Sequence, residues 1–253
     1  MGIVQGLTEF LPVSSTAHLV VLPILFKWDG ALVNSLSFDV SLHAGTLMSV
    51  LVCFYPDLMA MVLEKKKRPL IKFIAVGSVP AGLAGVLLHD RIAGALRSPW
   101  VIVCALVIFG IVMYVADLYG KRRRSLGSMR TGEALWVGVA QALALVPGVS
   151  RSGITISAAL ERGFTRQEAA RFSFLLSLPV IGGAALLEVP KALSAGPDAD
   201  LGLVAAGFVS AFITGTLAIK FMLAYLSKRG LGVFVLYRFM LAGVIAGWLW
   251  LAG

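Results

Sequence analysis

The distribution of hydrophobic and polar positions along this chain of 253 residues predicts an all-α membrane protein. Long apolar stretches alternate with short polar connections, and several reach the length of about 20 residues that a helix needs to cross a bilayer. They lie at residues 40–62, 71–89, 100–118, 172–188, 203–226 and 231–252. Only 14% of the residues are charged, whereas soluble domains average about 25%. We therefore expect a polytopic integral membrane protein with about six spanning helices, because no soluble core could hide this much apolar surface.

An internal repeat with an offset of 136 positions runs through the chain. The segment GIVQGLTEFLPVSS at 2–15 aligns without a gap with GVAQALALVPGVSR at 138–151. Each copy begins with an apolar run that is too short to cross the bilayer and that a proline, Pro12 or Pro147, interrupts. Residues that favour a helix N-cap follow each break. The pattern predicts two re-entrant helix-break-helix hairpins, which are tolerated at membrane depth only where protein or a watery cavity satisfies the broken backbone.

Basic residues gather in the short connections between the predicted spans. The clusters are KKKR at 65–68, KRRR at 121–124 followed by Arg130, and Lys228–Arg229. The positive-inside rule places these connections in the cytoplasm and the connections at 89–99 and 190–200 outside. The net charge of +9 is then explained by membrane topology, with lipid headgroups as partners. No basic face interleaved with aromatic residues suggests a nucleic-acid partner.

The same charge placement makes the two copies of the repeat opposite in direction. The span at 40–62 runs toward the cytoplasm, whereas its repeat partner at 172–188 runs away from it. We therefore expect an inverted-topology repeat within a single membrane domain, residues 1–253, whose halves are approximately 1–130 and 131–253. Paired interrupted segments of this kind indicate a binding site near the bilayer midplane.

Two ionisable residues, Glu9 and Arg151, lie in these otherwise apolar segments. An ionised side chain at this depth costs roughly 2.5–3.5 kcal/mol on insertion scales, so we expect each residue to have an ionic partner or a functional role. One interpretation is a structural ion pair between the repeats. The other is that Arg151 binds phosphate oxygens while Glu9 serves a proton or a metal ion. Arg151 opens a half-helix, whose N-terminus already favours anions, and this favours the phosphate site.

Three further side chains belong to the candidate chemistry. Gln5 and Glu9 are four positions apart on one helix face and could hold a divalent cation, although Gln5 could instead bond its repeat mate Gln141. Ser15 and His18 are three positions apart and could be a nucleophile and its base, or could form only local hydrogen bonds.

The two cysteines and the other two histidines do not form part of such a motif. Cys53 and Cys104 are interpreted as small packing residues, and no Cys/His spacing is typical of a zinc or iron site. His43 is expected to be a packed or hydrogen-bonded helix residue, and His89 an outer-loop residue.

The two long motifs together resemble the undecaprenyl-pyrophosphate phosphatase family, also called the bacitracin-resistance protein family. The matching residues are Gln5-x-x-x-Glu9 with FLPVSSTAH at 10–18, PGVSRSGIT at 147–155, GFTR at 163–166, FSF at 172–174 and Tyr237-Arg238. The resemblance covers nearly the whole chain. It implies a multi-pass enzyme of the bacterial cell membrane that removes the terminal phosphate of the C55 isoprenoid diphosphate. That reaction regenerates the lipid carrier for cell-wall synthesis and confers bacitracin resistance.

The resemblance also implies roles for individual residues. By motif position, the catalytic residues are Glu9, Ser15, His18 and Arg151, and the phosphate-binding residues are Ser14, Ser150, Arg151, Ser152 and Thr155. A divalent cation, Mg²⁺ or Ca²⁺, is implied at Glu9 and Gln5. Gln5 stands where the family often has Glu, so a mechanism with two carboxylates does not follow.

The sequence leaves several points open. The nucleophile is Ser15, His18 or an activated water, and a homodimer is compatible with the pattern. A transporter or flippase for an anionic lipid is the alternative function, because inverted repeats with broken helices are also a transporter architecture. Release of phosphate from a C55 diphosphate distinguishes the two.

Overall fold

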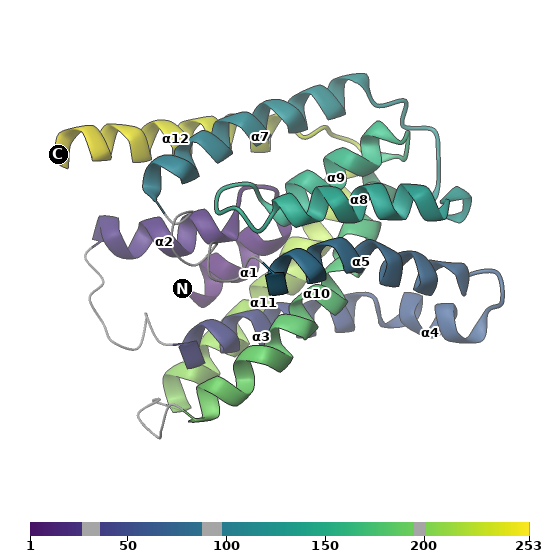
Figure 1. Cartoon of the computed structure of the whole chain (residues 1–253), viewed down its shortest axis with the longest axis horizontal. Coiled ribbons are helices and arrows are strands. Elements are labelled where there is room, and N and C mark those ends of the chain that lie inside the picture. Colours follow the sequence, from purple (N-terminus) through teal and green to yellow (C-terminus); the bar gives the residue numbers. More distant parts are fainter. Residues whose placement is uncertain (27–35, 88–97, 195–200, 253) are drawn as a thin grey trace.

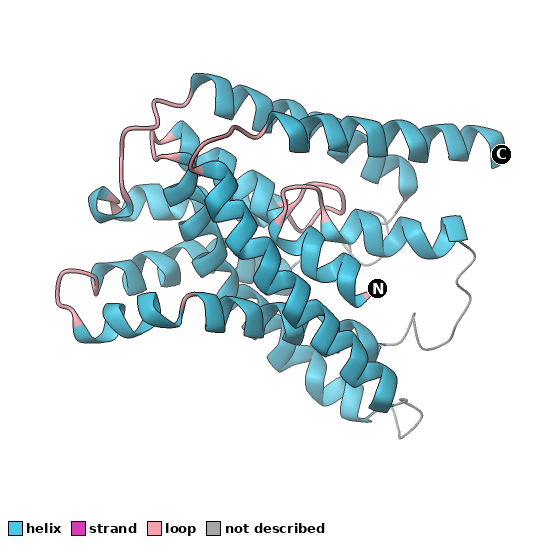
Figure 2. Ribbon diagram, turned by 180° about the vertical axis from the view of Figure 1, so that it is seen from behind, coloured by secondary structure: helices cyan, strands magenta, loops and turns pink. Residues whose placement is uncertain are grey.

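The computed structural model describes residues 1–26, 36–87, 98–194 and 201–252, and within these ranges the named elements are all helices. Figure 1 shows their arrangement and Figure 2 the view from behind. The helices are α1 (Gly2–Phe10), α2 (Ser15–Phe26), α3 (Leu36–Cys53), α4 (Tyr55–Leu63), α5 (Pro69–Leu87), α7 (Pro99–Tyr119), α8 (Thr131–Leu143), α9 (Arg151–Glu161), α10 (Arg166–Ser194), α11 (Leu201–Leu226) and α12 (Gly232–Ala252), with a 3₁₀ turn η2 (Leu126–Ser128). His89 and most of the two connections predicted outside the membrane lie outside the described residues.

The prediction of a polytopic membrane protein is confirmed. Among the described helices, α5, α7, α10, α11 and α12 are long and apolar enough to cross a bilayer, and the bent pair α3–α4 makes a sixth span. The expected span at 40–62 is therefore not one helix but two, bent by 59°. The break falls at Phe54, two positions before Pro56, because a proline has no N–H for the helical ladder and is tolerated only in a first turn.

The basic connections lie together at one end of the molecule, which we call the basic end. It comprises residues 64–68, 120–130, 162–165 and 227–231. Asp117 binds both the Arg166 side chain and the backbone N–H of Leu231, the latter at 2.9 Å. Lys66 and Lys67 border the same cavity, of about 510 Å³, as residues of α10 and η2. The prediction that these clusters share one side is confirmed.

The helices of the two halves run in opposite directions relative to the basic end. The α3–α4 pair ends there and its repeat partner α10 begins there, while α5 begins there and α11 ends there (Figure 1). The inverted repeat predicted from charge placement is therefore present in the fold.

Glycines fix the first half-helix of each hairpin against a spanning helix of the other half. A Cβ atom on Gly6 of α1 would lie 2.6 Å from the carbonyl oxygen of Ala211 on α11. A Cβ atom on Gly138 of α8 would lie 2.3 Å from the carbonyl oxygen of Gly77 on α5. Such close backbone approach is how helices associate in lipid, where no hydrophobic force drives them together. Each hairpin is thereby held between the two halves.

Candidate active site

The two hairpin breaks each contain a serine with a positive φ angle, which is rare for residues other than glycine. Ser14 has a φ of 73° and Ser150 a φ of 71°, a region that costs a non-glycine residue on the order of 1–3 kcal/mol. Each serine precedes the first residue of a half-helix, and its hydroxyl oxygen accepts a bond from a backbone N–H of that helix, Ala17 at 3.3 Å and Gly153 at 3.2 Å. Nearly equal positive φ angles at positions 136 apart show that the repeat extends to backbone geometry. The first residues of the two half-helices, Ser15 and Arg151, both bond Glu9.

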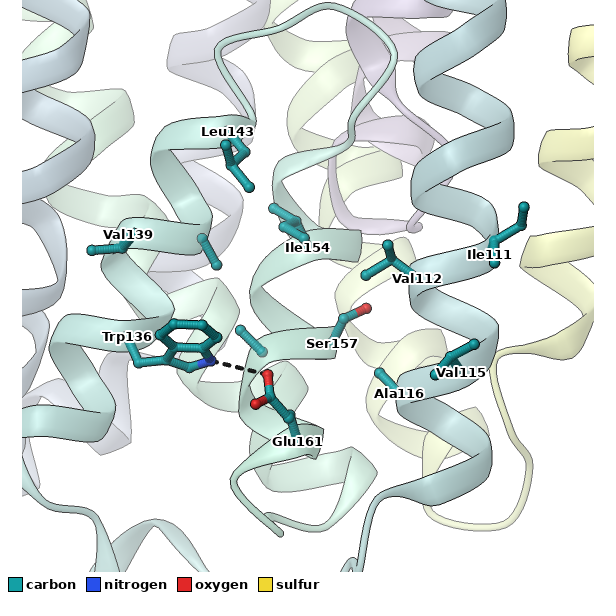
Figure 3. A pocket seen from close by; sticks show the side chains of 12 residues that line it. Ile111, Val112, Val115, Ala116, Trp136, Val139, Leu143, Ile154, Ser157 and Glu161 are labelled. Atoms are coloured by element: carbon teal, nitrogen blue, oxygen red, sulfur yellow. Dashed lines mark hydrogen bonds between the residues drawn. The ribbon is translucent and has the colours of Figure 1, made fainter.

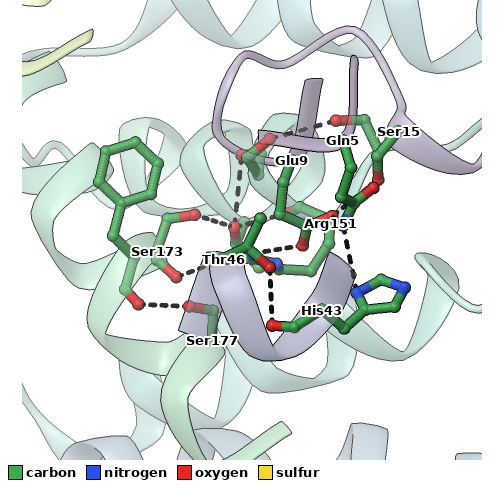
Figure 4. Close-up of polar contacts among 12 residues, drawn as sticks. Gln5, Glu9, Ser15, His43, Thr46, Arg151, Ser173 and Ser177 are labelled. Carbon is green, nitrogen blue, oxygen red and sulfur yellow. Dashed lines mark hydrogen bonds and ion pairs between the residues drawn. The ribbon is translucent and has the colours of Figure 1, made fainter. Parts of the chain in front are cut away.

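Glu9, at the end of α1, lies at the centre of the polar cluster between these helix starts (Figure 4). Its Oε1 accepts from Arg151 Nη2 at 2.8 Å, and its Oε2 accepts from Ser15 Oγ at 2.8 Å. The carboxylate is only 9% exposed. The sequence-predicted residues Glu9, Ser15 and Arg151 are therefore brought together, from α1, α2 and α9.

Arg151 is fixed by two partners at once. Besides the ion pair with Glu9, its Nη1 donates to the carbonyl oxygen of Ser173 on α10 at 3.0 Å. Ser173 was not singled out from the sequence as a site residue, although it lies in the FSF match at 172–174. A guanidinium held in this way presents its fork in a set orientation, which suits a phosphoryl group.

Two of the hydroxyls predicted to bind phosphate are engaged in holding the cluster. Ser152 Oγ donates to the carbonyl oxygen of Leu11, which ties the second hairpin to the first at 3.3 Å. Thr155 Oγ1 bonds the Arg151 carbonyl and the Ser173 hydroxyl, each at 2.7 Å. In this structure Thr155 therefore orients the start of α9 at Arg151, and Ser152 holds the two hairpins in contact.

Ser15 and His18, which could be a nucleophile and its base or form only local hydrogen bonds, bind different partners in this structure. His18 Nδ1 donates to the carbonyl oxygen of Ser14 at 2.7 Å, and its Nε2 lies 2.7 Å from the hydroxyl of Tyr237 on α12. The two rings stack with a centroid separation of 5.7 Å. Both ring nitrogens are thus engaged away from Ser15, whose partner is the carboxylate of Glu9.

His43, expected to be a packed or hydrogen-bonded helix residue, is hydrogen-bonded to a residue of the cluster. Gln5 Nε2 donates to Glu9 Oε2 and to His43 Nδ1, both at 3.2 Å. The alternative bond between Gln5 and Gln141 is absent, because both amide atoms of the buried Gln141 have no partner among the described residues. The signal that could have found His43 is an ionisable group inside a spanning stretch.

The cluster offers few side-chain oxygen atoms to a divalent cation. No group of three or more His, Cys, Asp or Glu side chains that could hold a metal occurs among the described residues. Gln5 Oε1 is buried and has no hydrogen-bond partner among the described residues, so one oxygen beside Glu9 is available to a cation. One such amide oxygen and one carboxylate suit a cation whose remaining ligands come from water and phosphate.

A separate apolar groove of about 420 Å³ lies between α7, α8 and α9 (Figure 3). Ile154, Leu143 and Val112 line it, and its polar contact is a bond of 3.2 Å from Trp136 Nε1 to Glu161. Hydrocarbon suits this lining and phosphate does not. A hydroxyl, a carboxylate and a guanidinium, the groups that could act on a phosphate, meet instead in the Glu9 cluster.

Comparisons with known proteins agree along the whole chain. The family model of the bacitracin resistance protein BacA matches residues 1–244. A protein of Thermodesulfovibrio yellowstonii named undecaprenyl-diphosphatase is 49% identical over 97% of this chain and 93% of its own. Proteins of the same name from Thermomicrobium roseum and Moorella thermoacetica are 44% and 41% identical, covering 97% and 99% of this chain and 94% and 96% of their own.

Proposed function

This chain belongs to the bacitracin resistance protein BacA family, and we propose that the Glu9, Ser15 and Arg151 cluster performs its reaction. The protein is an undecaprenyl-diphosphatase. It hydrolyses undecaprenyl diphosphate to undecaprenyl phosphate and inorganic phosphate, which recycles the lipid carrier for cell-wall synthesis and underlies bacitracin resistance. We place it in the bacterial plasma membrane, where such a lipid is available.

One observation supports this assignment of the site above the others. The Ser15 hydroxyl donates to Glu9, and the same carboxylate pairs with Arg151. A nucleophile, a base and a phosphate-binding cation therefore meet at two helix N-termini.

In the first step, Ser15 Oγ attacks the terminal phosphorus and its proton passes to Glu9 Oε2. The bond between that phosphorus and the bridging oxygen breaks, and undecaprenyl phosphate leaves with this oxygen. Arg151 must exchange Glu9 for phosphate oxygens when the diphosphate binds. The exchange moves the Arg151 guanidinium away from the Glu9 carboxylate when Glu9 must act as the base. It also places the guanidinium beside the phosphoryl oxygens, where negative charge develops in the transition state.

In the second step, a water molecule attacks the phosphoserine. Glu9 passes its proton to the departing Ser15 oxygen and accepts one from the water, so inorganic phosphate is released and both side chains are restored. Among the described residues His18 hydrogen-bonds Ser14 and Tyr237 rather than Ser15 or Glu9, and we propose that it orients the first turn of α2.

Gln5 Oε1 and Glu9 are the groups that we propose to contact a divalent cation, Mg²⁺ or Ca²⁺. Such a cation supplies charge neutralisation on the diphosphate oxygens. These two residues provide too few side-chain oxygens to retain a cation alone, so diphosphate oxygens would have to complete its ligand set.

Phosphate release tests the function directly. Purified protein in nanodiscs should release one phosphate per undecaprenyl diphosphate and none from undecaprenyl phosphate. Movement of the intact diphosphate across the bilayer without release of phosphate would favour the transporter alternative.

Ser15→Ala should lower kcat by about 10²–10⁴-fold, because it removes the attacking oxygen. Brief incubation of the parent with ³²P-labelled substrate should trap an alkali-labile phosphoserine that the variant lacks. Thr16→Ala removes a hydroxyl from the exposed neighbouring position and should retain activity. A Ser15→Ala enzyme with parental kcat would identify water as the nucleophile. His18→Asn should lose less activity than Ser15→Ala.

Chelation should abolish activity reversibly, and Mg²⁺ or Ca²⁺ should restore it. Gln5→Ala should raise the cation concentration for half-maximal rate by at least about tenfold, because it deletes a ligand oxygen. Elemental analysis of protein purified without added metal should find far less than one equivalent. A stoichiometric metal in that sample would contradict a ligand set completed by the diphosphate.

A further inference from the structure

Arg238 on α12 is fully buried, and within the described part of the chain its guanidinium hydrogen-bonds only to backbone carbonyls. It donates to five carbonyl oxygens: Leu106 at 3.2 Å, Ala105 at 3.2 Å, Gly148 at 2.8 Å, Val149 at 3.1 Å and Pro12 at 3.5 Å. Among the described residues it forms no ion pair. Neither hairpin contains this residue, and the reaction derived above does not use it.

The carbonyls that it binds come from both breaks and from one spanning helix. Pro12 is two positions before Ser14, and Gly148 and Val149 directly precede Ser150. A proline break and a positive φ leave such carbonyls without helical partners, and a carbonyl at membrane depth must find a donor. One planar group with five N–H donors satisfies both breaks and joins them to α7.

Stability alone is a poor explanation for a charge in this position. Two separate neutral donors could satisfy the two breaks, but they would not fix one break relative to the other. A single rigid guanidinium does, because the same atoms bind both.

We propose that Arg238 is a positioning residue that sets the separation of the two hairpins and so places Ser15 and Glu9 against Arg151. The proposal rests on the proposed function for its effect on rate, whereas the geometric part stands without it. Misplacing reacting groups by about 1 Å can cost about 10² in rate.

The chain offers a direct probe of hairpin separation. A Cβ atom on Gly153 would lie 3.5 Å from the Cβ of Pro12, within the range of about 3.5–4.5 Å that a disulfide requires. The pair Pro12→Cys and Gly153→Cys, in a background where Cys53 and Cys104 are alanine, should cross-link rapidly in membranes under mild oxidant. Adding Arg238→Met should slow cross-linking at least about tenfold, because the two introduced cysteines would no longer be held at the separation that disulfide formation requires.

Activity of the same proteins provides the second readout. Relative to the cysteine pair with Arg238 intact, Arg238→Met should lower kcat by about 10²-fold with little change in KM. Oxidation should restore most of the lost kcat, and a reductant should remove the gain. Arg171→Met is the matched control: Arg171 binds Asp57 at the basic end, and its loss should change neither readout.

The outcomes separate the two claims. Unchanged cross-linking would overturn the positioning role, whatever the activity. Slower cross-linking in a parent that releases no phosphate would support positioning and reject the proposed function. Arg238→Lys is a second variant for the case that Arg238→Met does not fold. It keeps the charge with fewer donors, so its cross-linking rate and kcat should be intermediate. Failure of both variants to insert and accumulate would assign Arg238 to folding and reject the proposal.

Discussion

Arg151→Ala and Arg151→Lys should each lower kcat by at least about 10²-fold, the cost of losing one preorganised donor to a developing charge. KM should change little, because prenyl-chain burial should supply much of the substrate affinity. Lysine should not rescue, since a single ammonium cannot hold Ser173 and form a bidentate fork with phosphate oxygens. Steady-state kinetics in nanodiscs, with thermal stability measured alongside, provides the measurement.

The ion pair with Glu9 makes a purely structural role the competing explanation for Arg151. Removing one partner leaves a buried charge without its match, which destabilises a protein. The double variant Arg151→Met, Glu9→Gln removes both charges and should recover stability but not activity. Recovery of turnover in this double variant would reject catalysis by the pair. Arg166→Lys changes an arginine whose partner, Asp117, lies at the basic end, and it should remain active.

Glu9→Gln should lower kcat by about 10²–10⁴-fold, the usual contribution of a positioned general base. The amide retains the size of the side chain, but it cannot accept the Ser15 proton. The parental rate should fall with decreasing pH as the carboxylate is protonated, and this acidic limb should be absent from the residual rate of the variant. A full pH–rate profile of both proteins is the measurement.

Two variants sharpen the interpretation of Glu9. Glu161→Gln makes the same chemical change at a half-exposed position on α9 and should retain activity. Glu9→Asp keeps the charge but shortens the reach to Ser15, so it should fall between parent and Glu9→Gln. Parental turnover of Glu9→Gln would eliminate Glu9 as the base, and a normal acidic limb in that variant would assign the titration to another group.

The sequence by itself determined the frame of this protein. Apolar length predicted the spanning helices, and proline placement predicted the half-helices that end at Phe10 and begin at Ser15 and Arg151. Charge placement predicted that the two copies of the repeat run in opposite directions. These features depend on the thickness of the bilayer, on the missing proline N–H and on the cost of moving basic loops across the membrane. Each of these acts on a short segment, so a single sequence is enough to predict them.

Only the tertiary structure decided which side chains meet. Spacing put Ser15 and His18 within one helical turn, yet His18 faces Tyr237, 219 positions away, and Ser15 turns to Glu9. Spacing likewise gave no reason to join His43 to Gln5 or Arg238 to both breaks. A buried polar group takes whichever partner satisfies it, because leaving it unpaired costs about 1–3 kcal/mol. That partner often comes from a distant helix, and its position is set by how the helices pack rather than by the intervening sequence.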